Sequence, residues 1–180
     1  RARALRKGYL ALVRGRLSPP EGVVDAPIAR DPRHRQRMAV VPGGREARTR
    51  YRTVRELPGY TLVEAWPETG RTHQVRVHLA HLGHPLAGDP LYGRGAAPPG
   101  LRRHFLHAHR LAFRHPSSGE WLELASPLPA DLAAVVESLA GVGESSPPGP
   151  PLAGSGRPRS SGERGSFTTE STGASEVTPS

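Results

Sequence analysis

Cysteine is absent from the 180 residues, which excludes disulfide frameworks, cysteine-based zinc sites and thiol catalysis. No apolar run approaches the ~20 residues that a membrane-spanning helix requires, and no secretion signal is visible. The sequence therefore predicts no membrane partner, and the lack of cysteine suits a cytoplasmic protein. Methionine is missing from position 1, and the segment from Arg1 to Lys7 leads directly into an apolar run. We therefore expect the chain to be the later part of a longer polypeptide.

Lysine is nearly absent too, because Lys7 is the only lysine among 25 basic residues. The net charge is nevertheless +9, with a sequence pI of about 11.2. A GC-rich genome would explain the preference for arginine over lysine, but it would not explain the excess of positive charge. Arginine binds phosphate through two parallel hydrogen bonds and stacks on bases. The charge therefore indicates a polyanionic partner, most simply nucleic acid.

The composition changes near Gly141, which divides the chain into two parts. Residues 142–180 are rich in Gly, Pro, Ser and Thr and contain too few apolar residues to form a core. We expect a disordered tail there and an ordered domain over residues 1–141. The tail holds three arginines and four glutamates, a net of −1, so the ordered part carries about +10 (9 + 1). The basic character therefore belongs to the folded domain.

Short apolar or alternating runs, separated by turn residues, predict antiparallel strands. The expected strands cover residues 9–13, 49–57, 60–66, 109–114 and 120–125. Residues 25–41 are expected to form an arginine-rich loop. Val75, Leu79 and Leu82 have helical spacing, which predicts a helix from Thr72 to just before Gly83. A second helix is expected over residues 129–140. With few helices and mainly antiparallel hairpins, the fold class is α+β.

Three kinds of chemistry can be weighed against this framework. His78, His81 and His84 could suggest a metal, but Asp89 is the only acidic residue near them, and arginines close by would repel a dication. We expect no metal. No GxSxG motif marks a nucleophilic serine, and no glycine-rich phosphate loop is present. A cationic pocket is the third possibility.

Arg76 and His73 are the candidates for such a pocket, because an i, i+3 spacing places both on the helix face opposite the apolar stripe. A partly buried arginine requires an anion, which could be a protein carboxylate or a ligand phosphate. The run from Arg30 to Arg37 could follow a phosphate backbone, although such runs are often merely solvated.

Several motifs, in order, resemble the RluA/RluD-type pseudouridine synthases. Residues Thr69–His78, TGRTHQVRVH, are similar to the family signature TGRTHQIRVH, and residues 81–93, HLGHPLAGDPLYG, continue it. Lys7–Val13 resembles the K-x-Y-L-A-L-V motif. Residues 26–32, 47–51, 106–111 and 113–129 fit the remaining pattern. The resemblance covers roughly Leu5 to Ala140.

This resemblance implies an incomplete pseudouridine synthase catalytic fold that isomerises uridine in RNA, most simply large-subunit rRNA, without a cofactor. The target base would be flipped into the pocket. Tyr9 would pack against that base and is a candidate proton acceptor, while Arg76 would pair with a nucleophilic aspartate. The residues expected to contact RNA are Arg30, Arg33, Arg35, Arg37, Arg71 and His73. The specific uridine and the oligomeric state are not predicted.

One departure from the family pattern concerns the nucleophile. The HRLDxxTSG motif that carries the family's aspartate is absent, and the family pattern gives Asp89 no nucleophilic role. The Gly-Asp-Pro setting of Asp89 suits a turn. We therefore expect the chain to be inactive alone, and to be poorly soluble if missing strands leave sheet edges exposed. A non-catalytic RNA-binding protein is the alternative.

Overall fold

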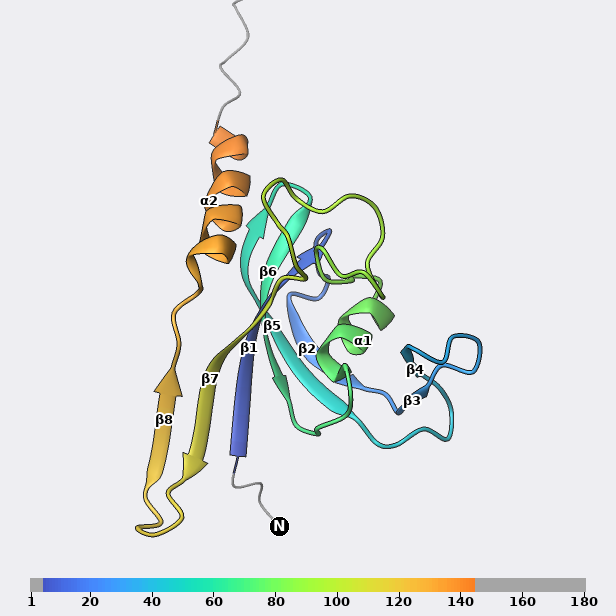
Figure 1. Ribbon diagram of the computed structural model, residues 1–180, viewed down its shortest axis with the longest axis vertical. Coiled ribbons are helices and arrows are strands. Elements are labelled where there is room, and N and C mark those ends of the chain that lie inside the picture. Colours follow the sequence, from blue (N-terminus) through green and yellow to red (C-terminus); the bar gives the residue numbers. More distant parts are fainter. Residues whose placement is uncertain (1–4, 145–180) are drawn as a thin grey trace, which may run out of the picture. The chain divides into compact units, whose positions relative to one another are not determined.

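The computed structural model describes residues 5–144, with side chains as far as Gly141. Its centre is a six-stranded antiparallel sheet in the order β2-β5-β6-β1-β7-β8 (Figure 1). The strands are β1 (Leu5–Arg14), β2 (Glu21–Asp25), β5 (Arg48–Leu57), β6 (Tyr60–Pro67), β7 (Leu106–Arg114) and β8 (Trp121–Ala125). The α+β class and the antiparallel hairpins predicted from sequence are confirmed.

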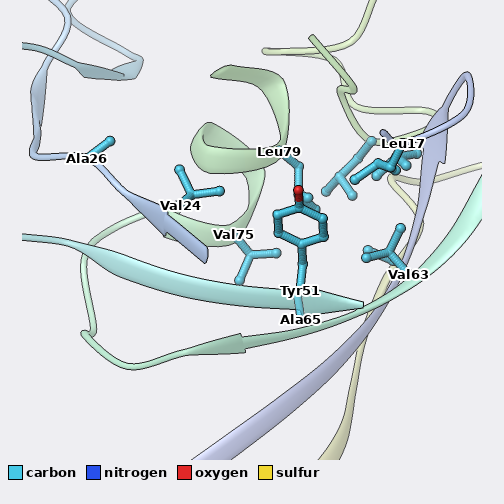
Figure 2. Packing of buried hydrophobic residues seen from close by; sticks show 11 residues of the cluster. Leu17, Val24, Ala26, Tyr51, Val63, Ala65, Val75 and Leu79 are labelled. Carbon is cyan, nitrogen blue, oxygen red and sulfur yellow. The ribbon is translucent and has the colours of Figure 1, made fainter. Parts of the chain in front are cut away.

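Two helices cover opposite faces of this sheet, α1 (Gln74–His81) and α2 (Ala130–Glu144) (Figure 1). Alternation along β1 explains this arrangement, because Ala11 and Val13 point to the α1 side while Leu12 points to the α2 side. Figure 2 shows Tyr51 of β5 reaching toward Val75 and Leu79 of α1. On the other face, Leu12 joins a cluster with residues of α2 and the fully buried Phe105.

Residues 25–41 are not a simple loop, and this expectation was wrong. They contain a small antiparallel hairpin of β3 (Ile28–Arg30) and β4 (Met38–Val40). The hairpin has few apolar residues of its own and is stabilised by tertiary contacts. Ile28 and Met38 belong to a cluster with Val77 of α1 and Tyr92. The arginine-rich segment is therefore the connection between two short strands packed beside α1 (Figure 1).

Both helices differ from their predicted limits. Helix α1 begins two residues later than expected, and Leu82 lies after its end with 37% of its surface exposed, so Leu82 is not part of the buried stripe. Val77 is buried instead, because β4 packs on another side of the helix. Helix α2 continues through Gly141 to Glu144. The disordered tail was predicted over residues 142–180, and this was wrong for residues 142–144, which form the last part of α2. The rest of the predicted tail, residues 145–180, lies outside the described residues.

Candidate functional site

A cleft of about 810 Å³ opens between the N-terminal half of β1 and the start of α1. Five basic side chains line it, and they are Lys7, Arg71, His73, Arg76 and His104. Tyr9 lies in the same lining, and no carboxylate does among the described residues. The cleft therefore presents positive charge and one phenol ring to a ligand.

Helix α1 is positioned by a chain of buried hydrogen bonds. Thr69 Oγ1 bonds to Gln74 Oε1 at 2.7 Å, and Gln74 Nε2 donates to Thr49 Oγ1 at 3.0 Å. Thr49 Oγ1 then lies 2.8 Å from His78 Nδ1, while His78 Nε2 lies 3.0 Å from the carbonyl oxygen of Ala26. Because a carbonyl only accepts, His78 Nε2 carries a proton and Nδ1 accepts from Thr49. These bonds connect the beginning and the middle of α1 to the sheet, so they set the direction of Arg76.

Two of the three histidines considered as metal ligands bond to other groups in the structure, and the third is exposed. His78 is fully buried in that hydrogen-bond chain, His81 is exposed, and His84 Nδ1 bonds to the carbonyl oxygen of Arg14. Within residues 5–144, no three histidine, aspartate or glutamate side chains gather as metal ligands would.

Burial is the main cause that lowers the pKa of His78, and it predicts an acid-sensitive fold. An unfolded histidine titrates near pH 6.5. Just below that pH the unfolded chain therefore binds a proton that the folded chain, in which the pKa of His78 is lowered, does not bind. In the pH range just below 6.5, the free energy of unfolding should fall by up to about 1.4 kcal/mol per pH unit for each such histidine. Urea unfolding at several pH values measures this slope.

The variant His78→Gln isolates the contribution of His78 to this slope. Burial also lowers the pKa of His73 and His104, so those side chains add slopes of their own. We expect His78→Gln to be less stable than the wild type at pH 7.5 and to lose less stability on acidification. A wild-type slope in this variant would contradict the prediction. The lowered pKa of Asp89 acts only below its ordinary value near 3.8, outside this window.

Arg76 has a carboxylate partner within the chain, which is one of the two kinds of anion considered from the sequence. Its Nε donates to Asp89 Oδ2 and its Nη2 to Asp89 Oδ1, each at 2.8 Å. Only 11% of the Arg76 side chain is exposed, and none of the Asp89 side chain is. Burial alone would raise the pKa of Asp89, but hydrogen bonds from Arg76 and from the Tyr92 and Leu91 N–H groups outweigh it and lower that pKa.

Asp89 is also the turn-forming residue that its sequence setting suggested. Its Oδ1 accepts hydrogen bonds from the N–H groups of Leu91 and Tyr92 at 2.9 and 3.1 Å. Gly93 is required here, because a Cβ at that position would overlap the carbonyl oxygen of Asp89. Gly88 has a φ of +68°, which glycine adopts readily. With both oxygens engaged and no exposed surface, Asp89 is not available as a nucleophile.

Tyr92 joins the cleft to the β3–β4 hairpin. The Cζ atoms of Arg76 and Arg37 lie 5.0 and 5.1 Å from its ring centroid, within the range of cation–π contacts. Its hydroxyl lies 3.0 Å from His73 Nδ1 and accepts a hydrogen bond from the backbone N–H of Met38. Tyr92 was not singled out from sequence, although its place in the GDPLYG motif was a usable signal.

The structure separates the predicted site residues into two groups. Tyr9, Arg71, His73 and Arg76 come together in the cleft. The other predicted RNA contacts lie on the hairpin outside it, and they are Arg30, Arg33, Arg35 and Arg37. Arg33 and Arg35 are exposed, Arg30 Nη1 donates to the carbonyl oxygen of Arg35, and Arg37 packs on Tyr92. His104 and Lys7 are cleft residues that were not predicted as site residues, although Lys7 stands in the K-x-Y motif.

Known structures with this fold define the class of the protein. Human RNA Pseudouridylate Synthase Domain Containing 1 superposes with a TM-score of 0.64 and 27% identity, covering 80% of this chain and 67% of that one. Human RNA Pseudouridylate Synthase Domain Containing 4 gives a TM-score of 0.60 and 26% identity over 75% of this chain and 62% of that one. The fold is thus that of a pseudouridylate synthase domain.

Sequence relatives agree with this class. Residues 1–81 match the family described as RNA pseudouridylate synthase. A protein of Chloroflexus aurantiacus, described as an uncharacterized RNA pseudouridine synthase, is 58% identical over 77% of this chain and 43% of its own length. The ribosomal large subunit pseudouridine synthase D of Nitrosomonas europaea is 50% identical over 80% of this chain and 44% of its own. The chain belongs to the RNA pseudouridine synthase family, among its RluA/RluD-type members, and spans less than half the length of these relatives.

No helix among the described residues is long and apolar enough to cross a membrane.

Proposed function

We propose that the protein carrying this chain isomerises uridine to pseudouridine in RNA, with large-subunit rRNA as the substrate. The observation that carries this proposal is the cationic cleft in which Tyr9 and the doubly held Arg76 face the same space. The rRNA substrate is supported by the relative that is named a ribosomal large subunit pseudouridine synthase. The cytoplasm is the expected compartment, because such a protein would meet its rRNA there.

In this proposal Arg76 serves two carboxylates. Asp89 occupies its Nε and Nη2, while Nη1 has no partner among the described residues. The third nitrogen is therefore available to a nucleophilic carboxylate brought to the cleft. Tyr9 would pack against the flipped base and accept a proton from it. The chemistry requires no metal or organic cofactor, and its proton transfers would involve the phenol and carboxylate groups.

No aspartate of the chain is placed to act as that nucleophile. Asp25, Asp31 and Asp131 lie outside the cleft lining, and Asp89 is sequestered by Arg76. We therefore propose that these 180 residues have no turnover alone. The test is to incubate unmodified large-subunit rRNA with the 180-residue chain and, separately, with the full-length protein encoded by the open reading frame that contains it. Pseudouridine is then assayed in both reactions. Turnover by the chain alone would mean that another residue supplies the chemistry.

A second candidate is a non-catalytic RNA-binding protein, which the absence of a carboxylate from the described cleft lining favours. The coding sequence upstream of Arg1 discriminates between the two. An in-frame HRLDxxTSG motif would support the enzyme, whereas a start codon at this boundary would support the binding protein.

The hairpin arginines are expected to act on RNA affinity more than on chemistry. Arg33 and Arg35 are exposed and lie outside the cleft. Replacing either with alanine should weaken RNA binding and reduce the slope of log affinity against log salt by about 0.7–0.9 per lost phosphate contact. Turnover at saturating RNA should change little. Binding titrations at 50–200 mM salt test this, in the range where such slopes are usually resolved.

Arg16→Ala is the matched control for the hairpin variants. Arg16 has 78% of its side chain exposed and pairs with Glu56, and it lies beyond the end of β1 away from the cleft. Its replacement removes the same charge without touching the proposed RNA surface. If Arg16→Ala reduces affinity and salt slope as much as Arg33→Ala, only the net charge matters and the hairpin is not an RNA contact.

A further inference from the structure

His73 has an unusual backbone conformation for its residue type. Its φ and ψ are 56° and 20°, in the left-handed region, and it is the one non-glycine residue with positive φ among residues 5–144. It immediately precedes α1, yet its side chain makes no capping hydrogen bond to the helix. Such conformations are held by their surroundings and gather at functional sites. The contacts of the His73 ring are therefore the place to look for the reason.

The hydrogen bonds around Tyr92 determine which nitrogen of His73 carries the proton. The Tyr92 hydroxyl oxygen has two neighbours, the Met38 N–H at 2.9 Å and His73 Nδ1 at 3.0 Å. The backbone N–H can only donate, so the single phenol proton needs an acceptor elsewhere. Tyr92 is only 6% exposed, and His73 Nδ1 is the available acceptor. Nδ1 is therefore unprotonated, and the proton of the neutral ring lies on Nε2.

The protonated nitrogen is free to meet a ligand. Nε2 has no partner among the described residues and is not an enclosed atom, while the His73 ring lines the cleft beside Arg71 and Arg76. Burial, and then the charge of Arg76, lower the pKa of His73, and Asp89 opposes this only in part. The ring therefore stays neutral at pH 7. The left-handed backbone places this donor at the cleft while Tyr92 holds the opposite side of the ring.

We propose that His73 is a neutral hydrogen-bond donor that recognises an acceptor oxygen of the uridine nucleotide in the cleft, and that Tyr92 is the positioning residue that fixes its tautomer. This inference rests on the proposed RNA function and adds to it. Arg71 and Lys7, which line the cleft, attract phosphate through charge, whereas a neutral N–H recognises an oxygen only when the distance and direction are right. His73 thus contributes selectivity for a correctly placed nucleotide.

The tautomer is tested by nitrogen-15 NMR of the histidine rings in the 180-residue chain. We expect Nδ1 of His73 to give the signal of an unprotonated nitrogen and Nε2 that of a protonated one. In Tyr92→Phe, which removes only the hydroxyl, the two tautomers should become mixed. A protonated Nδ1 in the wild-type chain, or no change in Tyr92→Phe, would overturn the proposal.

The ligand contact is tested by RNA binding to His73→Asn. Asparagine tolerates left-handed backbone and can replace Nδ1 near Tyr92, but it does not reach the position of Nε2. We expect the affinity for a uridine-containing RNA to fall by about 3- to 10-fold, as for the loss of one neutral hydrogen bond. The control His81→Asn changes an exposed histidine at the far end of the same helix and should leave affinity unchanged.

Two further comparisons distinguish the kind of acceptor and separate a failure of this inference from a failure of the proposed function. The His73→Asn effect should disappear on an RNA with an abasic site if the acceptor is a base carbonyl, and persist if it is a backbone oxygen. If wild-type and His73→Asn chains bind RNA equally, the role of His73 is wrong while the RNA function stands. If the wild-type chain binds no RNA, the proposed function fails with the ligand contact, and the NMR result still decides the tautomer.

Discussion

Replacing Arg76 with alanine in the full-length protein that contains this chain is expected to reduce kcat by at least about 100-fold, as for the loss of a single preorganised charged donor in an active site. Arg76 is held by Asp89 through Nε and Nη2 and lines the cleft, where we propose that Nη1 meets the nucleophilic carboxylate. The variant would leave the nucleophilic carboxylate without its counter-charge. RNA affinity should fall less than kcat does, because Arg71 and Lys7 still line the cleft. Single-turnover kinetics and RNA titrations measure the two effects separately.

Arg76→Lys separates the charge of Arg76 from its geometry. Lysine keeps the positive charge but cannot bond to Asp89 through two nitrogens while reaching a second carboxylate. We expect a large loss of kcat with RNA affinity close to wild type. Circular dichroism and thermal unfolding would verify that both variants are folded. If either folded variant retains wild-type kcat, or if the loss lies wholly in RNA affinity, Arg76 does not serve the chemistry.

The parts of the fold that sequence predicted well are those stabilised by local patterns. The β5–β6 hairpin follows from an alternating run before Pro58-Gly59 and an apolar run after it, and its pairing joins Leu57 to Tyr60 as that turn requires. Val75 and Leu79 likewise predicted the buried side of α1. Residues that are close in sequence determine such elements, so the local residue types are enough to predict them.

The β3–β4 hairpin was missed because distant residues stabilise it. Its apolar members, Ile28 and Met38, pack with Val77 and Tyr92, and the Met38 N–H bonds to a hydroxyl 54 residues away. A run of arginines with one proline, Pro32, lies between them and favours a loop when it is read alone. The local sequence is therefore a poor guide where tertiary contacts determine the structure.

Sequence identified several residues of the candidate site but not the contacts among them. Tyr9, Arg71, His73 and Arg76 were identified, and they share one cleft. The partner of Arg76 was missed because a role in a turn already accounted for Asp89. The two residues are also 13 positions apart with non-helical segments between them, so their spacing in the sequence does not indicate a contact. The two meet only because the chain reverses after α1, where Gly83 has a φ of +87°. Asp89 consequently has two functions, closing its own turn and holding Arg76.

Those two functions predict a large stability effect for Asp89→Ala. The change removes the acceptor of the Leu91 and Tyr92 N–H groups and leaves the guanidinium of Arg76, 11% exposed, without its counter-ion. Breaking one side of a buried, hydrogen-bonded pair costs about 3–5 kcal/mol, because the remaining charge is uncompensated. Since whole domains are stable by only about 5–15 kcal/mol, this variant should unfold at a much lower urea concentration. Urea unfolding of the 180-residue chain at pH 7.5 measures the effect.

Asp131→Ala is the matched control for this experiment, because the same residue type pairs with Arg103 at the surface with both side chains about half exposed. Exposed pairs contribute little, so the control should unfold like the wild type. The double variant Arg76→Ala/Asp89→Ala should lose less than the sum of the two single variants, because it leaves no unpaired buried charge. If Asp89→Ala is no less stable than Asp131→Ala, or if the two single effects simply add, Asp89 does not hold Arg76 in solution. The proposal that Arg76 presents Nη1 to a second carboxylate would then lose its structural basis.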